Sequence, residues 1–299
     1  MKSPFIQSFS RIRPRVRKFA PLAKYVLIFI IGFMIALLHQ FNQRDSAEKN
    51  FFKEIASEIS EKRPVPAEDS SILDALHITN HLLRYRTEIF HKNDGPVRIG
   101  GGGYDGSLTG DLMTANGACG SYADVLAELL ETMGFRTRIA QMKVGNTWGG
   151  HIIDEVQTSK GWVVLDASND LFFTTPSGRL ASFSDVSSNW EYYKTQTPGD
   201  YNQDYRYADV RYTNWEKIPV VMPLLKKALT LFVGSQRVNT ISIRPMILRK
   251  YKVYCLLLII SLVIVTFYLL KNLMGISMTK FGSFVPSREG MNLGLKQTA

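Results

Sequence analysis

The chain has 299 residues, 45% of them hydrophobic, which is enough for a folded domain and too apolar for a disordered protein. Its net charge of +10 comes from the two ends. Residues 1–44 carry +8 and residues 218–299 carry +10, whereas residues 45–217 carry 25 acidic and 17 basic side chains, a net charge of −8. A nucleic-acid-binding protein needs basic residues on the folded surface that meets phosphate. Here they flank apolar stretches, so we expect a lipid bilayer as a partner and no nucleic acid.

The first apolar stretch, Tyr25–Leu38, reaches the ~20 residues that cross a bilayer if its neighbours contribute. Seven Lys or Arg residues precede it and only Arg44 follows closely, which by the positive-inside tendency places the N-terminus in the cytoplasm. A cleaved signal peptide is the alternative, but no small-residue cleavage site follows Leu38. The second stretch, Tyr254–Leu270, has no charge and predicts a membrane helix that returns the chain to the cytoplasm.

These patterns divide the chain into segments with different surroundings. We expect a basic cytoplasmic tail (1–19), a membrane helix (20–40), a stalk helix and linker (41–69), an extracytoplasmic domain (70–217), an interfacial or juxtamembrane segment (218–252), a second membrane helix (253–273) and a cytoplasmic tail (274–299). The apolar run at 218–234 fits an interfacial helix or a buried core helix equally well.

The central domain has the pattern of helices followed by antiparallel strands. Apolar residues at helical spacing predict helices at 70–91 and at 119–133, the second one ended by Gly134. The strands that we expect next are 136–142, 151–157 and 162–165, the last two being joined by a short turn at 158–161.

Two polar segments of the domain have less regular patterns. The run GGGGYDG at 100–106 contains a formal GxGxxG, but no helix opens after it, so we expect a flexible loop near the active cleft rather than a nucleotide site. Residues 172–217 are rich in Tyr, Asp, Asn and Ser, and we expect a loop-rich subdomain or a lid over the sheet.

Cys119 is the only cysteine outside the two apolar stretches, and it begins a predicted helix. The unpaired N–H groups and the dipole of a helix N-terminus favour a thiolate, so the pKa of this thiol should be lowered. An extracytoplasmic cysteine normally forms a disulfide. The other cysteine, Cys255, lies in the second membrane stretch, which makes that pairing implausible and leaves Cys119 as a reactive thiol.

His151 and Asp166 are the expected partners of this thiol. If Val156 faces Trp162 across the turn, His151 lies opposite residue 167 and one step from Asp166, which can then hold the imidazole tautomer. Alone, each residue has an ordinary structural explanation: a buried thiol, a surface histidine and a turn aspartate. Together they predict a Cys-His-Asp triad.

These residues carry a resemblance to the transglutaminase-like superfamily of papain-fold cysteine enzymes. Its pattern has G-x-C opening a helix, then H-x-W-x-E-V on a strand and G-W-x-x-x-D on the next. The corresponding segments here are Gly117–Cys119, His151–Val156 and Gly161–Asp166, and Gly134–Arg138 is similar to the family's helix-to-strand step. Two positions depart from the pattern, since Ile153 replaces the usual tryptophan and Ala167 replaces the proline that commonly follows the aspartate.

The resemblance implies an α+β fold with a papain-like core, a helix packed on an antiparallel sheet, here flanked by two transmembrane helices. It implies Cys119 as nucleophile, His151 as general base and acid, and Asp166 as the orienting carboxylate. The Cys119 backbone N–H is one expected oxyanion donor, and Asn116 and Trp148 are candidates for the second. The resemblance is to membrane-anchored bacterial proteins, and with the charge distribution we expect a protein of the bacterial inner (cell) membrane whose catalytic domain is periplasmic or extracellular.

No cofactor and no metal are expected. His77 and His81 have the i, i+4 spacing of a zinc pair, but no glutamate follows His77 and a third ligand is missing from the pattern. The expected function is attack on an amide or acyl bond of a protein or peptide substrate. The alternative is a catalytically idle module that binds a partner in an envelope or polysaccharide-export assembly.

Overall fold

The computed structural model describes residues 13–61, 67–85, 91–92, 95–96, 108–113, 119–245 and 250–273. The chain forms two compact units, one made of Met1–His39 and Leu256–Ala299 and the other of Gln40–Cys255. Two helical stretches, Lys24–Glu61 and Tyr251–Lys271, are long and apolar enough to cross a membrane. Their large side chains face outward, as in Phe29 (74% exposed) and Phe267 (69% exposed), which is not the burial pattern of a core helix.

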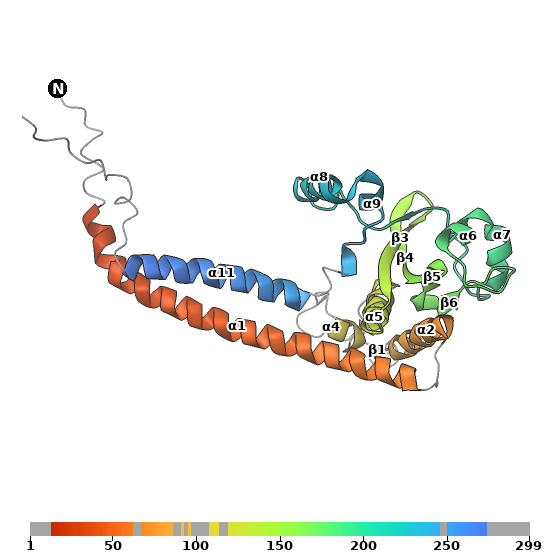
Figure 1. Ribbon diagram of the computed structural model, residues 1–299, viewed down its shortest axis with the longest axis horizontal. Coiled ribbons are helices and arrows are strands. Elements are labelled where there is room, and N and C mark those ends of the chain that lie inside the picture. Colours follow the sequence, from red (N-terminus) through yellow and green to blue (C-terminus); the bar gives the residue numbers. More distant parts are fainter. Residues whose placement is uncertain are drawn as a thin grey trace, which may run out of the picture. The chain divides into compact units, whose positions relative to one another are not determined.

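Helix α1 (Arg13–Glu61) continues through the position where the sequence analysis separates a membrane helix from a stalk (Figure 1). No glycine or proline occurs between Phe33 and Glu61, so nothing in the sequence interrupts the helix there. Its last turns are part of the domain rather than a free stalk. Phe52, Ala56 and Ile59 are buried in the same apolar cluster as residues of α2 (Glu68–Arg84) and α5 (Cys119–Thr132).

The domain is built on a five-stranded antiparallel sheet with the strand order β6-β5-β4-β3-β7. Its strands are β3 (Arg136–Val144), β4 (Thr147–Thr158), β5 (Gly161–Asp166), β6 (Leu171–Phe172) and β7 (Val210–Arg211). The short strands β1 (His91–Lys92) and β2 (Gly95–Pro96) pair separately, and α4 (Leu108–Met113) precedes α5. Helices packed on an antiparallel sheet confirm the expected α+β fold class.

The two faces of the sheet are covered by different parts of the chain. On one face, Val156, Val163 and Leu165 pack against α2 and α5 in a single apolar cluster. On the other face, Ile153 and Val164 pack against the segment that follows β6 (Figure 1). That segment contains α6 (Phe183–Ser188), α7 (Trp190–Tyr193) and the 3-10 turn η2 (Lys194–Gln196), and it includes the residues expected to form a loop-rich cover.

The predicted register of the β4–β5 hairpin is wrong by one residue. Val156 pairs with Val163 and not with Trp162, because the turn is a two-residue one that lets Thr158 pair with Gly161. Gly161 has a φ of +121°, which only glycine adopts without strain. Leu165 pairs with Asp154, so Asp166 follows on the face of the sheet that also carries Ile153 and His151.

Several boundaries also differ from the sequence patterns. The helix expected to reach His91 ends at Arg84, and β3 and β4 extend to a tight turn at Gly145, whose φ is +58°. Helix α8 (Val221–Val233) has no buried residue, so the core-helix interpretation of this stretch is wrong. The GGGGYDG loop at 100–106 lies outside the described residues.

Candidate active site

Cys119 is the first residue of α5, the helix that packs on the sheet, and its side chain is partly buried. The backbone N–H of Ile152, on β4, donates a hydrogen bond to the sulfur. The thiol therefore lies where the N-terminus of a buried helix meets the strand that carries His151. Both the helix dipole and the donated hydrogen bond favour the thiolate.

His151 is directed by an irregularity in β4. The pairing of β3 with β4 shifts between Met142 and Lys143, because Gly149 and Gly150 have no partners on β3 and form a β-bulge. Gly149 has a φ of +81°, and an added Cβ on Gly150 would lie 2.7 Å from the Cβ of Val144. Both positions therefore require glycine, and the bulge places the buried side chain of His151 at the end of the regular part of the strand.

The two ring nitrogens of His151 have different surroundings. Nε2 lies 2.6 Å from Oδ2 of Asp166, and both side chains are buried. Nδ1 is also buried and makes no hydrogen bond within the described residues. The Cys119 side chain contacts the same ring. Because Asp166 occupies Nε2, Nδ1 is the nitrogen left for the sulfur.

The ring plane of His151 is fixed by Tyr205. The two rings are stacked, with centroids 4.1 Å apart and planes 12° from parallel. Tyr205 belongs to the segment between η2 and β7, so the polar cover of the sheet forms one wall of the site. An imidazole that stacks on an aromatic ring and bonds a carboxylate cannot flip freely, so its two nitrogens keep their separate surroundings.

Asp166 ends β5 and accepts hydrogen bonds from several side chains. Ser168 donates to Oδ1 at 2.9 Å, and Asn169 donates to Oδ2 at 3.0 Å. The Tyr201 hydroxyl lies 3.2 Å from Oδ2. The turn that carries Ser168 and Asn169, η1 (Ala167–Asn169), is held by Asn80 of α2, which donates to the carbonyl of Ala167 at 3.0 Å. The carboxylate is therefore fixed from both sides of the sheet.

The charges of the three side chains support one another. Burial alone would raise the pKa of Asp166, but hydrogen bonds from His151, Asn169 and Ser168 lower it. Burial would lower the pKa of His151, but Asp166 and Cys119 raise it to about 9. Burial would also raise the pKa of Cys119, but His151 and the Ile152 N–H lower it. The pKa of His151 is raised and that of Cys119 is lowered, and both shifts favour a thiolate–imidazolium pair over two neutral groups.

A partly buried ion pair joins the same helix to Arg244. Asp124 of α5 is fully buried, and Arg244 donates to its two oxygens at 2.7 and 3.0 Å. The guanidinium also covers Gly120, where an added Cβ would lie 2.7 Å from Nη2. Asp154 of β4 is fully buried nearby, and neither of its oxygens has a hydrogen-bond partner among the described residues. Burial and the charge of Asp124 raise its pKa well above the ordinary value.

The other residues singled out from the sequence are not brought to this site by any described contact. The ring of Trp148, at the tip of the β3–β4 hairpin, faces the guanidinium of Arg211 at 5.1 Å, and Asn116 lies outside the described residues. Nδ1 of His77 pairs with Asp170 at 2.6 Å. Within the described part of the chain, no three His, Cys, Asp or Glu side chains are grouped as metal ligands.

Sequence reasoning missed the residues that support His151 and Asp166. Tyr201 and Tyr205 lie in the segment noted for its tyrosines, but no periodicity in it indicates which ring faces the sheet. Ser168 and Asn169 follow Asp166 directly, and Ser and Asn residues next to a strand end are frequent in ordinary turns. The only sequence signal for the tyrosines was the composition of residues 172–217, which predicted a cover over the sheet but not the residues that reach His151 and Asp166.

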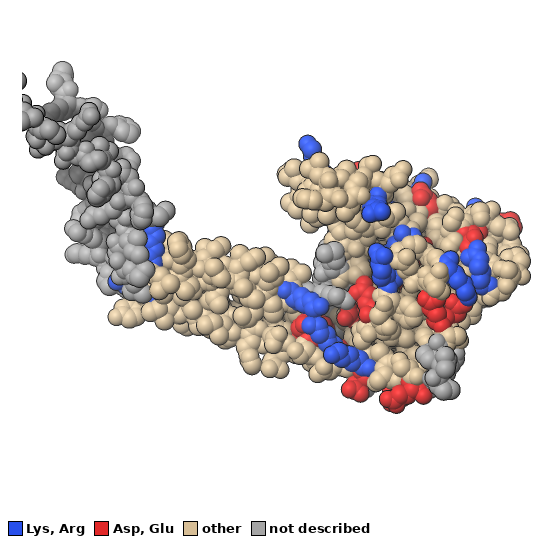
Figure 2. Space-filling model, viewed as in Figure 1, with Lys and Arg blue, Asp and Glu red and all other residues tan. Residues whose placement is uncertain are grey.

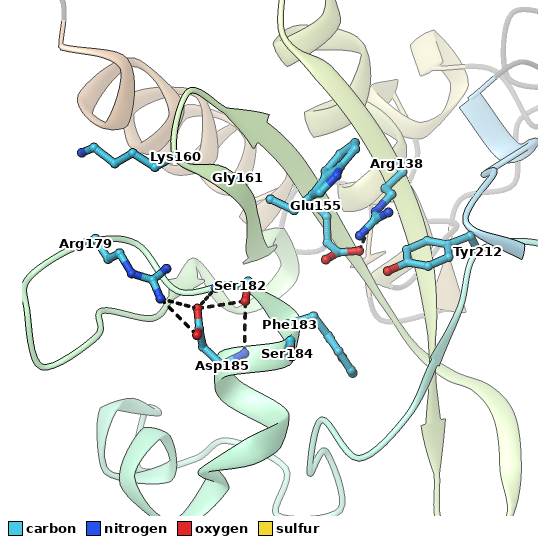
Figure 3. A pocket seen from close by; sticks show the side chains of 11 residues that line it. Arg138, Glu155, Lys160, Gly161, Arg179, Ser182, Phe183, Ser184, Asp185 and Tyr212 are labelled. Carbon is cyan, nitrogen blue, oxygen red and sulfur yellow. Dashed lines mark hydrogen bonds and ion pairs between the residues drawn. The ribbon is translucent and has the colours of Figure 1, made fainter. Parts of the chain in front are cut away.

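A hollow of about 460 Å³, away from Cys119, opens near the β4–β5 turn (Figure 3). Its Arg138 guanidinium lies between the rings of Trp162 and Tyr212, 4.0 and 4.2 Å from their centroids, and 2.8 Å from Glu155. The other charged residues that line it are also paired, Arg179 with Asp185 and Lys160 with Asp69. The charged side chains that line this hollow therefore neutralise one another.

Comparison with known proteins identifies the central segment. Residues 86–167 match the family described as the transglutaminase-like superfamily. No curated protein and no solved structure gives a significant match to the chain. The matched range includes Cys119, His151 and Asp166 together with α5, β3, β4 and β5. Residues 86–167 of this chain therefore carry a transglutaminase-like superfamily domain.

Proposed function

We propose that this domain is a cysteine enzyme in which Cys119, His151 and Asp166 act as nucleophile, general base and acid, and orienting carboxylate. The Cys119 thiolate attacks the acyl carbon of an amide or related bond, and the imidazolium of His151 gives its proton to the leaving group. A thioester on Cys119 remains. Water or an amine then attacks the thioester, gives its proton to His151 and restores the thiolate.

The observation that carries this proposal is the arrangement around His151. Its Nε2 is held 2.6 Å from a buried carboxylate, Nδ1 is left without a hydrogen bond among the described residues, and the ring lowers the pKa of the Cys119 thiol beside it. A general base needs both a fixed tautomer and a nucleophile within reach. The Cys119 backbone N–H, at the start of α5, is well suited to be one oxyanion donor.

We also propose that the domain lies on the extracytoplasmic side of a bacterial inner membrane, with both termini in the cytoplasm. The charge distribution supports this orientation, since seven basic residues precede the first apolar stretch and the domain between the stretches is acidic. A peptide or protein is the proposed substrate, because the acyl chemistry of a thiolate suits amide groups.

The reactivity of Cys119 tests the proposal directly. The full chain carrying Cys255→Ser, in detergent, would be treated with iodoacetamide at pH 6 and pH 8 and analysed by mass spectrometry. An ordinary thiol, with a pKa of about 8.5, reacts about 100-fold more slowly at pH 6 than at pH 8. We expect less than about tenfold for Cys119, and a return to ordinary behaviour in His151→Gln.

The same preparation separates an enzyme from a binding module. Incubation with a mixture of peptides should give a mass increase confined to Cys119, corresponding to an acyl group, which disappears with Cys119→Ser. Ordinary pH-dependent labelling of Cys119 together with no acylated species would favour the catalytically idle module instead.

A further inference from the structure

Residues 214–240 form an arm that leaves the domain and returns to it at the same place. Thr213, just after β7, donates a side-chain hydrogen bond to the carbonyl of Ile241 at 2.7 Å, and the N–H of Ile243 donates back to the Thr213 hydroxyl at 3.2 Å. Ser242 adds a hydrogen bond to the carbonyl of Ile139 on β3 at 2.8 Å. The base of the arm is therefore attached to the sheet, while α8 and α9 (Ser235–Asn239) extend beyond it (Figure 1).

Helix α8 is the amphipathic part of this arm. At 100° per residue, Lys226, Lys227 and Thr230 share one side with Pro223, and the other apolar residues occupy the rest. None of the 13 residues is buried, whereas eight residues of α5 are. The surface over α8 is mostly uncharged in the view of Figure 2.

The most exposed side of α8 is also apolar. Leu231 is 82% exposed and Phe232 is 85% exposed, values expected of charged residues in a water-soluble protein. Other large side chains on this helix and just before it are also exposed: Ile218, Val220, Val221, Leu224 and Leu225. An apolar patch of this kind on a folded domain indicates a contact that the domain alone does not supply.

A lipid bilayer is the partner that the chain indicates for this patch, since two of its helical stretches are able to cross one. The base of the arm ends at Arg244, and the second stretch begins at Tyr251. Seven residues span at most about 25 Å when fully extended, and α8 is itself about 20 Å long. The arm is therefore tethered close to any membrane that this stretch enters.

The composition of α8 matches that of a helix that lies in a membrane interface. Such helices combine a wide apolar face containing Leu and Phe with lysines that reach the headgroups. Lys226 and Lys227 supply the cations, and Lys226 is held 5.9 Å from the ring of Trp215 at the base of the helix. Two adjacent lysines favour anionic headgroups.

We propose that α8 lies in the headgroup region of an anionic bilayer, with Leu231 and Phe232 inserted toward the acyl chains, and attaches the sheet edge to the membrane surface. The contact is independent of the chemistry at Cys119. It gives the domain a third membrane attachment, made by a folded arm in addition to the two apolar stretches.

Depth-dependent fluorescence quenching tests the proposal. In the full chain carrying Cys119→Ser and Cys255→Ser, Leu231→Cys would be labelled with bimane and reconstituted into vesicles of phosphatidylcholine and phosphatidylglycerol. Gln236→Cys, exposed on α9, is the matched control. We expect nitroxide-labelled lipids to quench the label at position 231 at least about threefold more than the label at 236, and iodide in the water to show the opposite preference.

Equal quenching of both positions by iodide would overturn the proposal. So would a rapid disulfide between the 231 positions of two chains, because that result assigns the patch to a second copy. Because Leu231 is exposed, its substitution should leave the thermal unfolding midpoint unchanged, and this measurement checks that both labelled proteins are folded. None of these readouts uses the Cys119 thiol, so they are independent of the proposed enzymatic function.

Discussion

Nε2 of His151 and Oδ2 of Asp166 lie 2.6 Å apart in the interior of the domain. His151 lies within β4, just after the β-bulge, and Asp166 is the last residue of the neighbouring strand β5. The β-bulge at Gly149 and Gly150 directs the imidazole, and the η1 turn holds the carboxylate. A buried carboxylate with this many donors stays ionised and keeps the imidazole protonated on the side away from the thiol. In the proposed triad, this contact acts on Cys119 through the imidazole, whose pKa it raises.

Asp166→Asn should reduce the reactivity of Cys119. The amide keeps the size of the side chain but removes the charge, so the pKa of His151 falls from about 9 toward its ordinary value and the pKa of the thiol rises. We expect the alkylation rate at pH 6 to fall by about tenfold or more. The matched control is Asp170→Asn, which removes the partner of His77 at the same 2.6 Å distance but outside the site. Equal effects of the two substitutions would contradict the assignment.

The stacked ring of Tyr205 should contribute through its position and not through its hydroxyl. Tyr205→Phe keeps the ring that stacks 4.1 Å from His151, and we expect an unchanged alkylation rate. Tyr205→Ala lets the imidazole rotate and should lower the rate about three- to tenfold, as expected for the loss of one aromatic pair. Tyr192→Ala, which removes a partly exposed ring that packs edge-on against Tyr193, serves as the control. Loss of reactivity in Tyr205→Phe would point to the hydroxyl instead.

Local patterns were sufficient to predict the elements that carry Cys119, His151 and Asp166. The helix beginning at Cys119 follows from the spacing of its apolar residues and from Gly134, which has a φ of +92°. Alternation of apolar residues and the polar turn predicted the strands that carry His151 and Asp166. These short-range signals agree with one another, which is why they were enough to predict the α+β class that the antiparallel sheet and its helices confirm.

Features that depend on distant contacts could not be predicted in this way. The register of β4 and β5 follows from the exact turn, and turns of two and three residues, which differ by one position in register, fit the same Thr158–Gly161 segment. The burial of Phe52 and Ile59 depends on α2 and α5 packing beside them, and an isolated amphipathic helix has the same pattern. Arg244 reaches Asp124 from 120 positions away, a separation that no local pattern encodes.

Gly150→Ala should disturb the strand that carries His151. The added methyl group would lie 2.7 Å from the Cβ of Val144 and 2.8 Å from its Cγ2, atoms close to the backbone that cannot swing away. We expect a loss of about 1–3 kcal/mol in the free energy of unfolding and a slower reaction of Cys119. Gly199→Ala is the control, because a Cβ there meets open space. If both variants unfold at the wild-type midpoint, the bulge is not as tightly packed as described.

Asp154 should make the stability of the domain depend on pH. Burial and the neighbouring Asp124 raise the pKa of Asp154 well above its ordinary value, so the folded protein keeps a proton that the unfolded chain releases above about pH 4. This contribution is fully present below that pH and is lost as the pH rises toward the folded-state pKa, by up to about 1.4 kcal/mol per pH unit. Asp154→Asn has the same shape and no proton to lose.

Thermal unfolding of the full chain at pH 5, 6 and 7 would measure this difference. Relative to the wild type, Asp154→Asn should become steadily more stable as the pH rises, because only the wild type must hold a carboxyl group protonated in an environment that excludes the charge. Asp204→Asn, at an exposed position, should follow the wild type at all three values. If the curves of Asp154→Asn and the wild type are parallel, the Asp154 carboxyl is solvated or paired in the folded protein, and the interior behind the Cys119 helix is less dry than its burial indicates.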